Sequence, residues 1–206
     1  MKRNSLLIVI GLALVGLVAA VAASFLHGGL SARATPGRLE TFVARNARRL
    51  ATPSNARLAQ NPLLATEEDL RDARMHFADH CAICHANDGS GHTLIGDGLY
   101  PKPPDLRLQQ TQNMTDGELF WIIENGVRFT GMPAFSNSGD HGGQEATWKL
   151  VHFIRHLPHL TAVERLEMER YNPKGPGDRA EEQEENDFLN GATPAAKPES
   201  QNHHQK

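Results

Sequence analysis

The 206-residue chain has only two cysteines, Cys81 and Cys84, which are separated by two residues. Because no second pair of cysteines exists, a four-ligand zinc site would need histidines to complete it. The chain also lacks an excess of positive charge, since 21 Lys and Arg residues are balanced by 24 Asp and Glu residues. Nucleic acid is therefore not indicated as a partner. No internal repeat and no strand pattern is present, which favours an all-α fold.

A long apolar run lies near the N-terminus. Lys2 and Arg3 precede the segment LLIVIGLALVGLVAAVAASFL, residues 6–26. As a helix this segment is about 31 Å long, close to the ~30 Å of a bilayer core. It predicts a single-pass inner-membrane anchor, and the leading positive charge predicts that the rest of the chain is periplasmic. The alternative is a cleaved signal peptide, although the run exceeds the usual ~7–15 residues of a signal core.

Composition divides the chain into four predicted segments. Residues 1–26 form the transmembrane anchor, or an uncleaved signal-like segment, and residues 27–65 form a basic linker. Residues 66–160 form the folded domain, and residues 161–206 form an acidic, largely disordered tail. Blocks of like charge of this kind usually belong to solvated segments.

The basic linker contains a stretch with helical periodicity. Leu39, Phe42 and Val43 recur on one face, and four arginines are interspersed among the apolar positions: Arg38, Arg45, Arg48 and Arg49. This pattern is typical of an interfacial helix that lies on anionic headgroups. A solvated helical spacer below the domain is an equally good interpretation.

Three helices are predicted within the folded domain. Thr66 caps a helix that leads to Cys81, Thr115 and Glu118 form a capping box for a second helix that ends before Gly126, and residues 144–157 form a third. Two long loops rich in glycine and proline separate these helices. The prediction is a small all-α domain whose loops wrap around something other than protein, because the apolar residues are few for the space enclosed.

The pair Cys81 and Cys84 is followed directly by His85, and three chemistries compete for this C-x-x-C-H sequence. A zinc site lacks well-spaced further ligands. A thiol–disulfide redox pair is expected at a strand-to-helix junction, and no strand pattern surrounds the motif. Covalent attachment of haem c, in which both thiols bind the vinyl groups and the histidine binds iron, is the third chemistry.

A methionine far along the chain favours haem. Met132 lies in a turn-rich loop between Gly131 and Pro133, 47 residues after His85. The glycine permits a close approach of the backbone and the proline restricts it, which suits a thioether held against a metal. His92 and His141 are loop histidines that remain alternative ligands. The predicted iron ligands are His85 and Met132.

Three segments carry a resemblance to a known family. CAICH, DGELFWIIENGVRFTGMPAF and WKLVHFIRHLP occur in the order and spacing of a class I c-type cytochrome, in particular the membrane-anchored bacterial monohaem type. The resemblance covers about residues 66–160. It implies one covalent haem c, a crossing of Ala73 and Phe77 with Trp148 or Phe153, and a proximal-histidine hydrogen bond to the carbonyl of Pro103 or Pro104.

The expected function is one-electron transfer in a respiratory chain, with iron cycling between Fe(III) and Fe(II) and no enzymatic activity of the chain itself. Both axial positions are filled by His85 and Met132, and methionine ligation raises the reduction potential. The expected partners are redox proteins at the membrane: an oxidase, a quinol-oxidising complex or a dehydrogenase. The alternative is a haem enzyme or a gas or redox sensor with a dissociable distal ligand.

Overall fold

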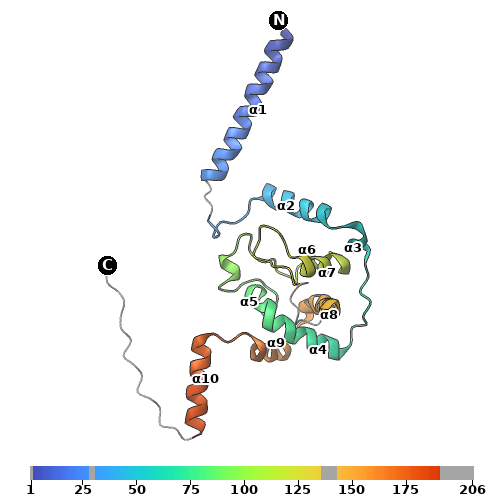
Figure 1. Ribbon diagram of the computed structural model, residues 1–206, viewed down its shortest axis with the longest axis vertical. Coiled ribbons are helices and arrows are strands. Elements are labelled where there is room, and N and C mark those ends of the chain that lie inside the picture. The colour runs from blue at the N-terminus through green and yellow to red at the C-terminus, as the bar shows by residue number, and fades with distance from the viewer. Residues whose placement is uncertain (1, 28–30, 136–142, 191–206) are drawn as a thin grey trace, which may run out of the picture.

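Every regular element in the described part of the chain is helical, as the computed structural model of the protein in Figure 1 shows. The structure describes residues 2–27, 31–135 and 143–190, and the side chains of residues 2–4, 6, 24–27 and 176 are outside this description. The all-α prediction is confirmed. In chain order the α-helices are α1 (Lys2–His27), α2 (Arg38–Ala51), α3 (Ser54–Leu58), α4 (Glu67–His76), α5 (Ala82–His85), α6 (Gln109–Gln112), α7 (Asp116–Asn125), α8 (Gly143–His156), α9 (Ala162–Met168) and α10 (Pro176–Leu189).

The N-terminal helix corrects one prediction. α1 forms, but no helix in the described ranges combines the length and the apolar character needed to cross a membrane. The predicted transmembrane anchor at residues 1–26 is therefore wrong. The predicted single-pass location at the inner membrane, with a periplasmic haem domain, depended on that anchor and is wrong with it.

The folded part is organised around the crossing of α4 and α8. Thr66 caps α4 by accepting a hydrogen bond from the Asp69 backbone N–H (3.1 Å), as its sequence predicts. The small side chain of Ala73 lets the two helices approach closely, and Ala73 is 1 % exposed. One turn later the Phe77 ring lies 5.2 Å from the Phe153 ring, between centroids, and tilted by 58°. The crossing predicted from the family resemblance is thus present and uses Phe153.

Helix α7 covers the other side of α8. Its capping box forms as predicted, because Thr115 accepts from the Glu118 backbone N–H while the Glu118 carboxylate accepts from the Thr115 backbone N–H. The rings of Phe120 and Trp148 stack with centroids 4.1 Å apart, which joins α7 to α8. α4, α7 and α8 therefore frame a space between them, and the long loops close it (Figure 1).

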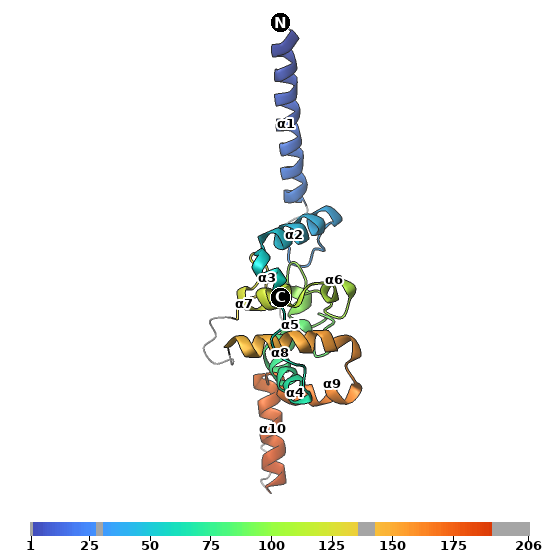
Figure 2. The same cartoon turned by 90° about the vertical axis from the view of Figure 1, so that its right-hand side faces the viewer.

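Residues beyond 160 add to this frame. Met168, at the end of α9, is fully buried in the same hydrophobic core as Phe77 and Phe153. Arg74 of α4 forms ion pairs of 2.8 Å with Glu164 and Glu167 of α9. Short turns complete this region, with 3₁₀ turns η3 (Leu157–His159) and η4 (Glu169–Tyr171) on either side of α9. α10 then extends away from the body, on the opposite side from α1 (Figures 1 and 2).

The segment before the domain is attached to it by hydrogen bonds. Thr115 donates its hydroxyl hydrogen to the Arg57 carbonyl (2.8 Å), and Asn61 donates to the Trp148 carbonyl (2.9 Å). α2 lies between α1 and the loops of the domain in both views (Figures 1 and 2). The expected apolar face of this helix is exposed, with Leu39 76 % and Phe42 65 % accessible.

Candidate functional site

The loops and helices enclose a cavity of about 600 Å³. Its walls come from α5, α7, α8 and the loops on either side of α7, so residues from 48 to 154 meet there. Most of the wall is apolar, including Leu99, Leu106, Leu119, Ile122, Phe135 and Leu150. A cavity of this size and lining suits an organic cofactor.

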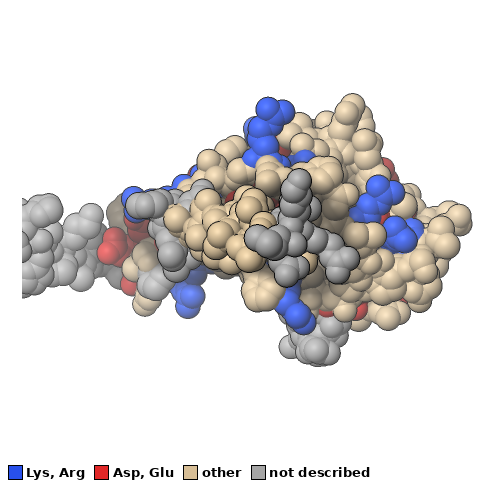
Figure 3. Space-filling view, turned by 90° about the horizontal axis from the view of Figure 1, so that it is seen from above, with Lys and Arg blue, Asp and Glu red and all other residues tan. Residues whose placement is uncertain are grey.

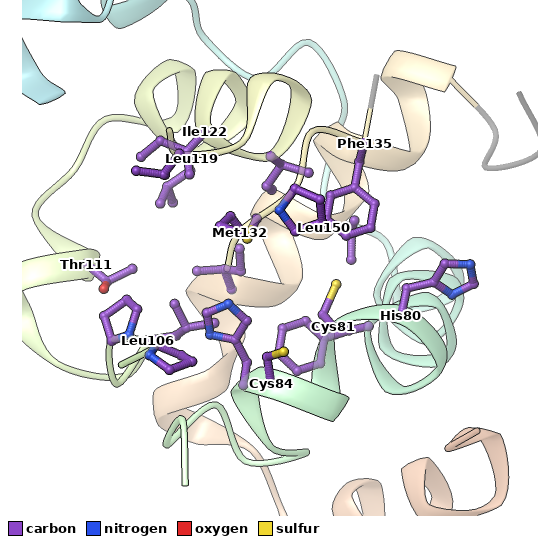
Figure 4. Close-up of a pocket in the computed structure, with 18 of the residues that line it drawn as sticks. His80, Cys81, Cys84, Leu106, Thr111, Leu119, Ile122, Met132, Phe135 and Leu150 are labelled. Carbon is purple, nitrogen blue, oxygen red and sulfur yellow. The ribbon is translucent and has the colours of Figure 1, made fainter. Parts of the chain in front are cut away.

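The first wall carries the C-x-x-C-H sequence. The helix begun by α4 widens into a π-helical turn, η1 (Phe77–Cys81), and continues directly as α5. Single π-turns of this kind are common at functional sites because they change the direction of the side chains that follow. Figure 4 shows the sulfur atoms of Cys81 and Cys84 on the same side of the helix, directed toward the space below Met132.

The two cysteines are free thiols in the structure. Burial, and secondarily the neighbouring Cys84, raises the pKa of Cys81 to about 12. Burial also raises the pKa of Cys84. Since reactive thiols and zinc ligands need a lowered pKa, these environments disfavour redox exchange and zinc binding. Within the described residues, no group of three or more His, Cys, Asp or Glu side chains is placed to bind a metal ion.

His85 ends α5 and lines the same cavity. Burial lowers the pKa of its imidazole, and the carbonyl of Pro104 opposes this shift. Its Nδ1 atom is buried and has no hydrogen-bond partner of normal geometry among the described residues. Pro104 therefore approaches the ring without completing a hydrogen bond. Of the two prolines considered from the sequence, the structure selects Pro104 as the neighbour of His85.

The loop that carries Pro104 is held in place by hydrogen bonds to the C-x-x-C-H segment itself. The backbone N–H of Gly91 donates to the His85 carbonyl (2.8 Å), and the Thr93 hydroxyl donates to the Ile83 carbonyl (2.8 Å). Gly91 has φ +78°, and a β-carbon there would lie 2.7 Å from the carbonyl oxygen of Pro103. A residue with a side chain would therefore push the two prolines away from the cavity.

Met132 lies on the opposite wall, in the loop that follows α7. Gly126 ends α7 with φ +66°, and the Val127 backbone N–H donates to the Met132 carbonyl (3.1 Å). The Thr130 hydroxyl donates to the Val127 carbonyl (2.7 Å) and accepts from the Met132 backbone N–H (3.1 Å). This tight turn places Met132 across from Cys81 and Cys84 (Figure 4). All four site residues predicted from the sequence, Cys81, Cys84, His85 and Met132, line one cavity.

Other sulfur and imidazole groups lie in or near the cavity. Met114 also lines the cavity, but its sulfur atom lies 4.0 Å from the guanidinium of Arg48. The ring of His80 is directed away from Met132 (Figure 4). The side chain of His92 is 79 % exposed and faces Asp97. His141, the remaining alternative, lies outside the described residues. Arg48 itself was not predicted to belong to the site, because it belongs to the preceding segment.

The residues present fit haem c. Two neutral thiols on one helical turn face the apolar cavity, which suits thioether bonds that carry no charge. The buried and unpartnered Nδ1 of His85, with the Pro104 carbonyl beside it, suits an imidazole that binds a metal through its other nitrogen. The orphaned nitrogen would otherwise be a cost to the fold.

Comparison with known proteins supports this assignment. Residues 68–154 match the family model described as cytochrome C oxidase, cbb3-type, subunit III. A comparison with curated protein sequences finds no significant match. The matched residues form a c-type cytochrome domain, and a domain of this kind carries covalently bound haem c. This range contains the C-x-x-C-H sequence and the residues of the α4–α8 crossing. It also contains every residue that lines the cavity except Arg48.

Proposed function

We propose that this chain is a one-electron carrier of a respiratory chain, with haem c attached through Cys81 and Cys84 and its iron bound by His85 and Met132. The observation that carries the proposal is the placement of all four side chains around one apolar cavity. Haem c supplies the chemistry, because its iron exchanges a single electron between Fe(III) and Fe(II). The c-type domain fits electron transfer rather than enzymatic turnover.

The residues of the cavity have separate tasks. Cys81 and Cys84 would hold the group at one edge, and the Pro104 carbonyl lies beside the His85 ring, where a small shift would let it accept from Nδ1. Met132 would bind the iron from the opposite wall of the cavity, in place of a substrate. Ile83, between the two cysteines, is 45 % exposed, and this edge of the cavity therefore borders solvent. An edge near solvent supports electron exchange with a partner that docks there.

The partner is proposed to be a redox protein of an electron-transfer complex. The family that matches residues 68–154 is described as a subunit of a cbb3-type oxidase, which supports an oxidase as the acceptor. A quinol-oxidising complex or a dehydrogenase would supply the electron. On the face seen in Figure 3, Lys and Arg side chains lie in separate small groups, so no single basic patch dominates that face. Short-lived docking through a small interface is typical of such encounters.

The test is Met132→Ala, with Met114→Ala as the matched control, since both methionines line the cavity. We expect Met132→Ala to keep its covalent haem but to lose the methionine-to-iron charge-transfer band and to bind carbon monoxide in the reduced form. Met114→Ala should keep the band and remain inert to carbon monoxide. The opposite pattern would assign the ligand to Met114.

The wild-type protein provides the second part of the test. A wild-type protein that lacks the charge-transfer band and binds carbon monoxide readily would favour a haem enzyme or a sensor. Absence of covalent haem from the wild-type protein, measured by haem staining after denaturing electrophoresis, would contradict the whole proposal.

A further inference from the structure

Arg48 is a cation on the cavity wall that comes from outside the c-type domain. It belongs to α2, which ends at Ala51, whereas the matched range begins at residue 68. Its side chain lines the cavity together with those of Cys81, His85 and Met132. The helix that carries it is exposed over most of its length, so a half-buried arginine on this helix needs a reason.

The position of α2 over the cavity is fixed on both sides of Arg48. The Tyr100 hydroxyl donates to the Glu40 carboxylate (2.5 Å), and Arg45 donates to the side-chain oxygen of Gln110 (2.5 Å). After α2, the bond from Thr115 to the Arg57 carbonyl fixes the chain again. Contacts from three different parts of the domain therefore hold this helix in place, and Arg48 faces the cavity as a consequence.

The guanidinium of Arg48 has no carboxylate in contact. No ion pair of 4.0 Å or less joins it to a described residue, and one of its nitrogen atoms lies 4.0 Å from the sulfur atom of Met114. Burial lowers the pKa of Arg48, Glu118 raises it and Arg45 lowers it. An arginine stays charged in all such environments, and a partly desolvated charge without a partner is costly. An anion next to Arg48 would therefore remove this cost.

Haem supplies an anion at this place. In haem, the two rings that carry propionates lie opposite the two rings that carry vinyl groups. Thioether bonds to Cys81 and Cys84 would hold the vinyl edge at one side, and the propionates would then face the far side of the cavity. Thr111 is drawn on the far side of the cavity from Cys81 in Figure 4, and the Met114 backbone N–H donates to the Thr111 carbonyl (3.0 Å). Because the Arg48 guanidinium lies 4.0 Å from the sulfur of Met114, Arg48 lies on this far side as well.

We propose that Arg48 binds a propionate carboxylate of the haem, so that a residue from the segment preceding the c-type domain completes the cofactor site. The inference rests on the proposed function, because it requires haem attached at Cys81 and Cys84. An arginine is suited to this task, since its planar donors match a carboxylate. The pair also places a positive charge beside the haem, which disfavours the oxidised iron and raises the reduction potential.

The experiment compares Arg48→Met with Arg49→Met in the full-length haem-loaded protein. Both substitutions remove one positive charge from α2, but Arg49 is exposed and does not line the cavity. We expect Arg48→Met to shift the reduction equilibrium about tenfold toward the oxidised form, or about 59 mV for one electron. Arg49→Met should shift it several times less. Arg48→Lys, which keeps the charge, should recover most of the wild-type potential.

A second measurement separates direct contact from a distant field. The redox-difference infrared spectrum reports the carboxylate bands of the propionates. These bands should move in Arg48→Met and stay unchanged in Arg49→Met. Equal potentials for the two variants, or unmoved propionate bands in Arg48→Met, would overturn the pairing.

The amount of covalent haem keeps this failure distinct from failure of the proposed function. Haem staining of all variants is compared with the wild type before the potential is measured. A wild type without covalent haem contradicts the proposed function. A fully loaded wild type, with Arg48→Met indistinguishable from Arg49→Met, contradicts only the role of Arg48.

Discussion

The cavity wall that carries Cys81, Cys84 and His85 is built by the core of the molecule, whereas the wall that carries Met132 is built by a loop. Within the first wall Phe77 is 2 % exposed and packs on Phe153. The second wall depends on one positive-φ glycine and a few hydrogen bonds around Thr130. The comparison indicates that the wall with Cys81, Cys84 and His85 is coupled to global stability, while the loop that carries Met132 can be altered without unfolding the domain.

The largest effect is expected at the attachment wall itself. The double substitution Cys81→Ser, Cys84→Ser removes both thiols that face the cavity, and no other cysteine exists to replace them. We expect covalent haem to be lost completely, as measured by haem staining after denaturing electrophoresis and by the mass of the intact protein. Each single substitution leaves one thioether. Haem that remains covalently bound in the double variant would show that the attachment site lies elsewhere.

Phenylalanines on the two walls provide a matched pair. Phe77→Ala removes a buried ring that packs on Phe153 and lines the cavity, and such truncations cost about 3–5 kcal/mol. Phe129, in the loop before Met132, is 92 % exposed, so Phe129→Ala is expected to change stability by less than about 0.5 kcal/mol. Denaturant unfolding of the haem-loaded proteins measures both. Similar losses in the two variants would remove the distinction between a core-built wall and a loop-built wall.

Gly126→Ala tests the loop-built wall directly. A β-carbon at Gly126 would lie 2.6 Å from the carbonyl carbon of Pro133 and 2.7 Å from the carbonyl oxygen of Met132, and φ is +66°. The left-handed conformation alone costs about 1–2 kcal/mol for a residue with a side chain. We expect the loop to shift, so that the methionine-to-iron charge-transfer band weakens while covalent haem is unchanged.

Gly98→Ala is the control for this substitution. A β-carbon at Gly98 meets no atom within 4 Å, and its backbone is not in the positive-φ region. The absorption spectrum and the stability of Gly98→Ala should match those of the wild type. An unchanged charge-transfer band in Gly126→Ala would mean that the loop holds Met132 less tightly than its contacts indicate.

Features set by local sequence were predictable, and features set by tertiary contacts were not. The caps at Thr66 and Thr115 depend on residues three positions apart, so they could be identified directly from the sequence. The sequence also singled out Cys81, Cys84, His85 and Met132, which line one cavity, and their roles toward haem stay predictions. The membrane-spanning expectation for residues 1–26 was wrong, since no described helix has the required length and apolar character.

Arg48 and Met168 illustrate what the sequence could not reveal. Arg48 is one of four arginines on a helix with an exposed apolar face, and only its position over the cavity distinguishes it. Met168 is preceded and followed by charged residues, yet it is fully buried because α9 folds back onto α4. In both cases the contact joins residues more than 60 positions apart, and no local pattern encodes it. The predicted boundary at residue 160 stays a prediction.

The smallest effect concerns the ion pairs that hold α9 behind the attachment wall. Burial raises the pKa of the Glu164 carboxyl, but hydrogen bonds from Thr161 and from His156 outweigh it, so the net pKa is lowered. The unfolded chain therefore binds this proton more readily than the folded protein. The stabilisation is fully present above the ordinary glutamate pKa and is lost as the pH falls through the lower, folded-state value.

Glu164→Gln removes this contribution and weakens the pairs with Arg74 and His156. At pH 7 we expect a loss of about 1 kcal/mol or less, and the difference from the wild type should disappear in acid. Glu181→Gln, on the exposed surface of α10, is the control and should leave stability unchanged at every pH. The measurement is denaturant unfolding of the haem-loaded proteins from pH 7 downward. Because the pair lies behind the core-built wall, Glu164→Gln should leave the methionine-to-iron charge-transfer band intact, and loss of that band would mean that the two walls are coupled.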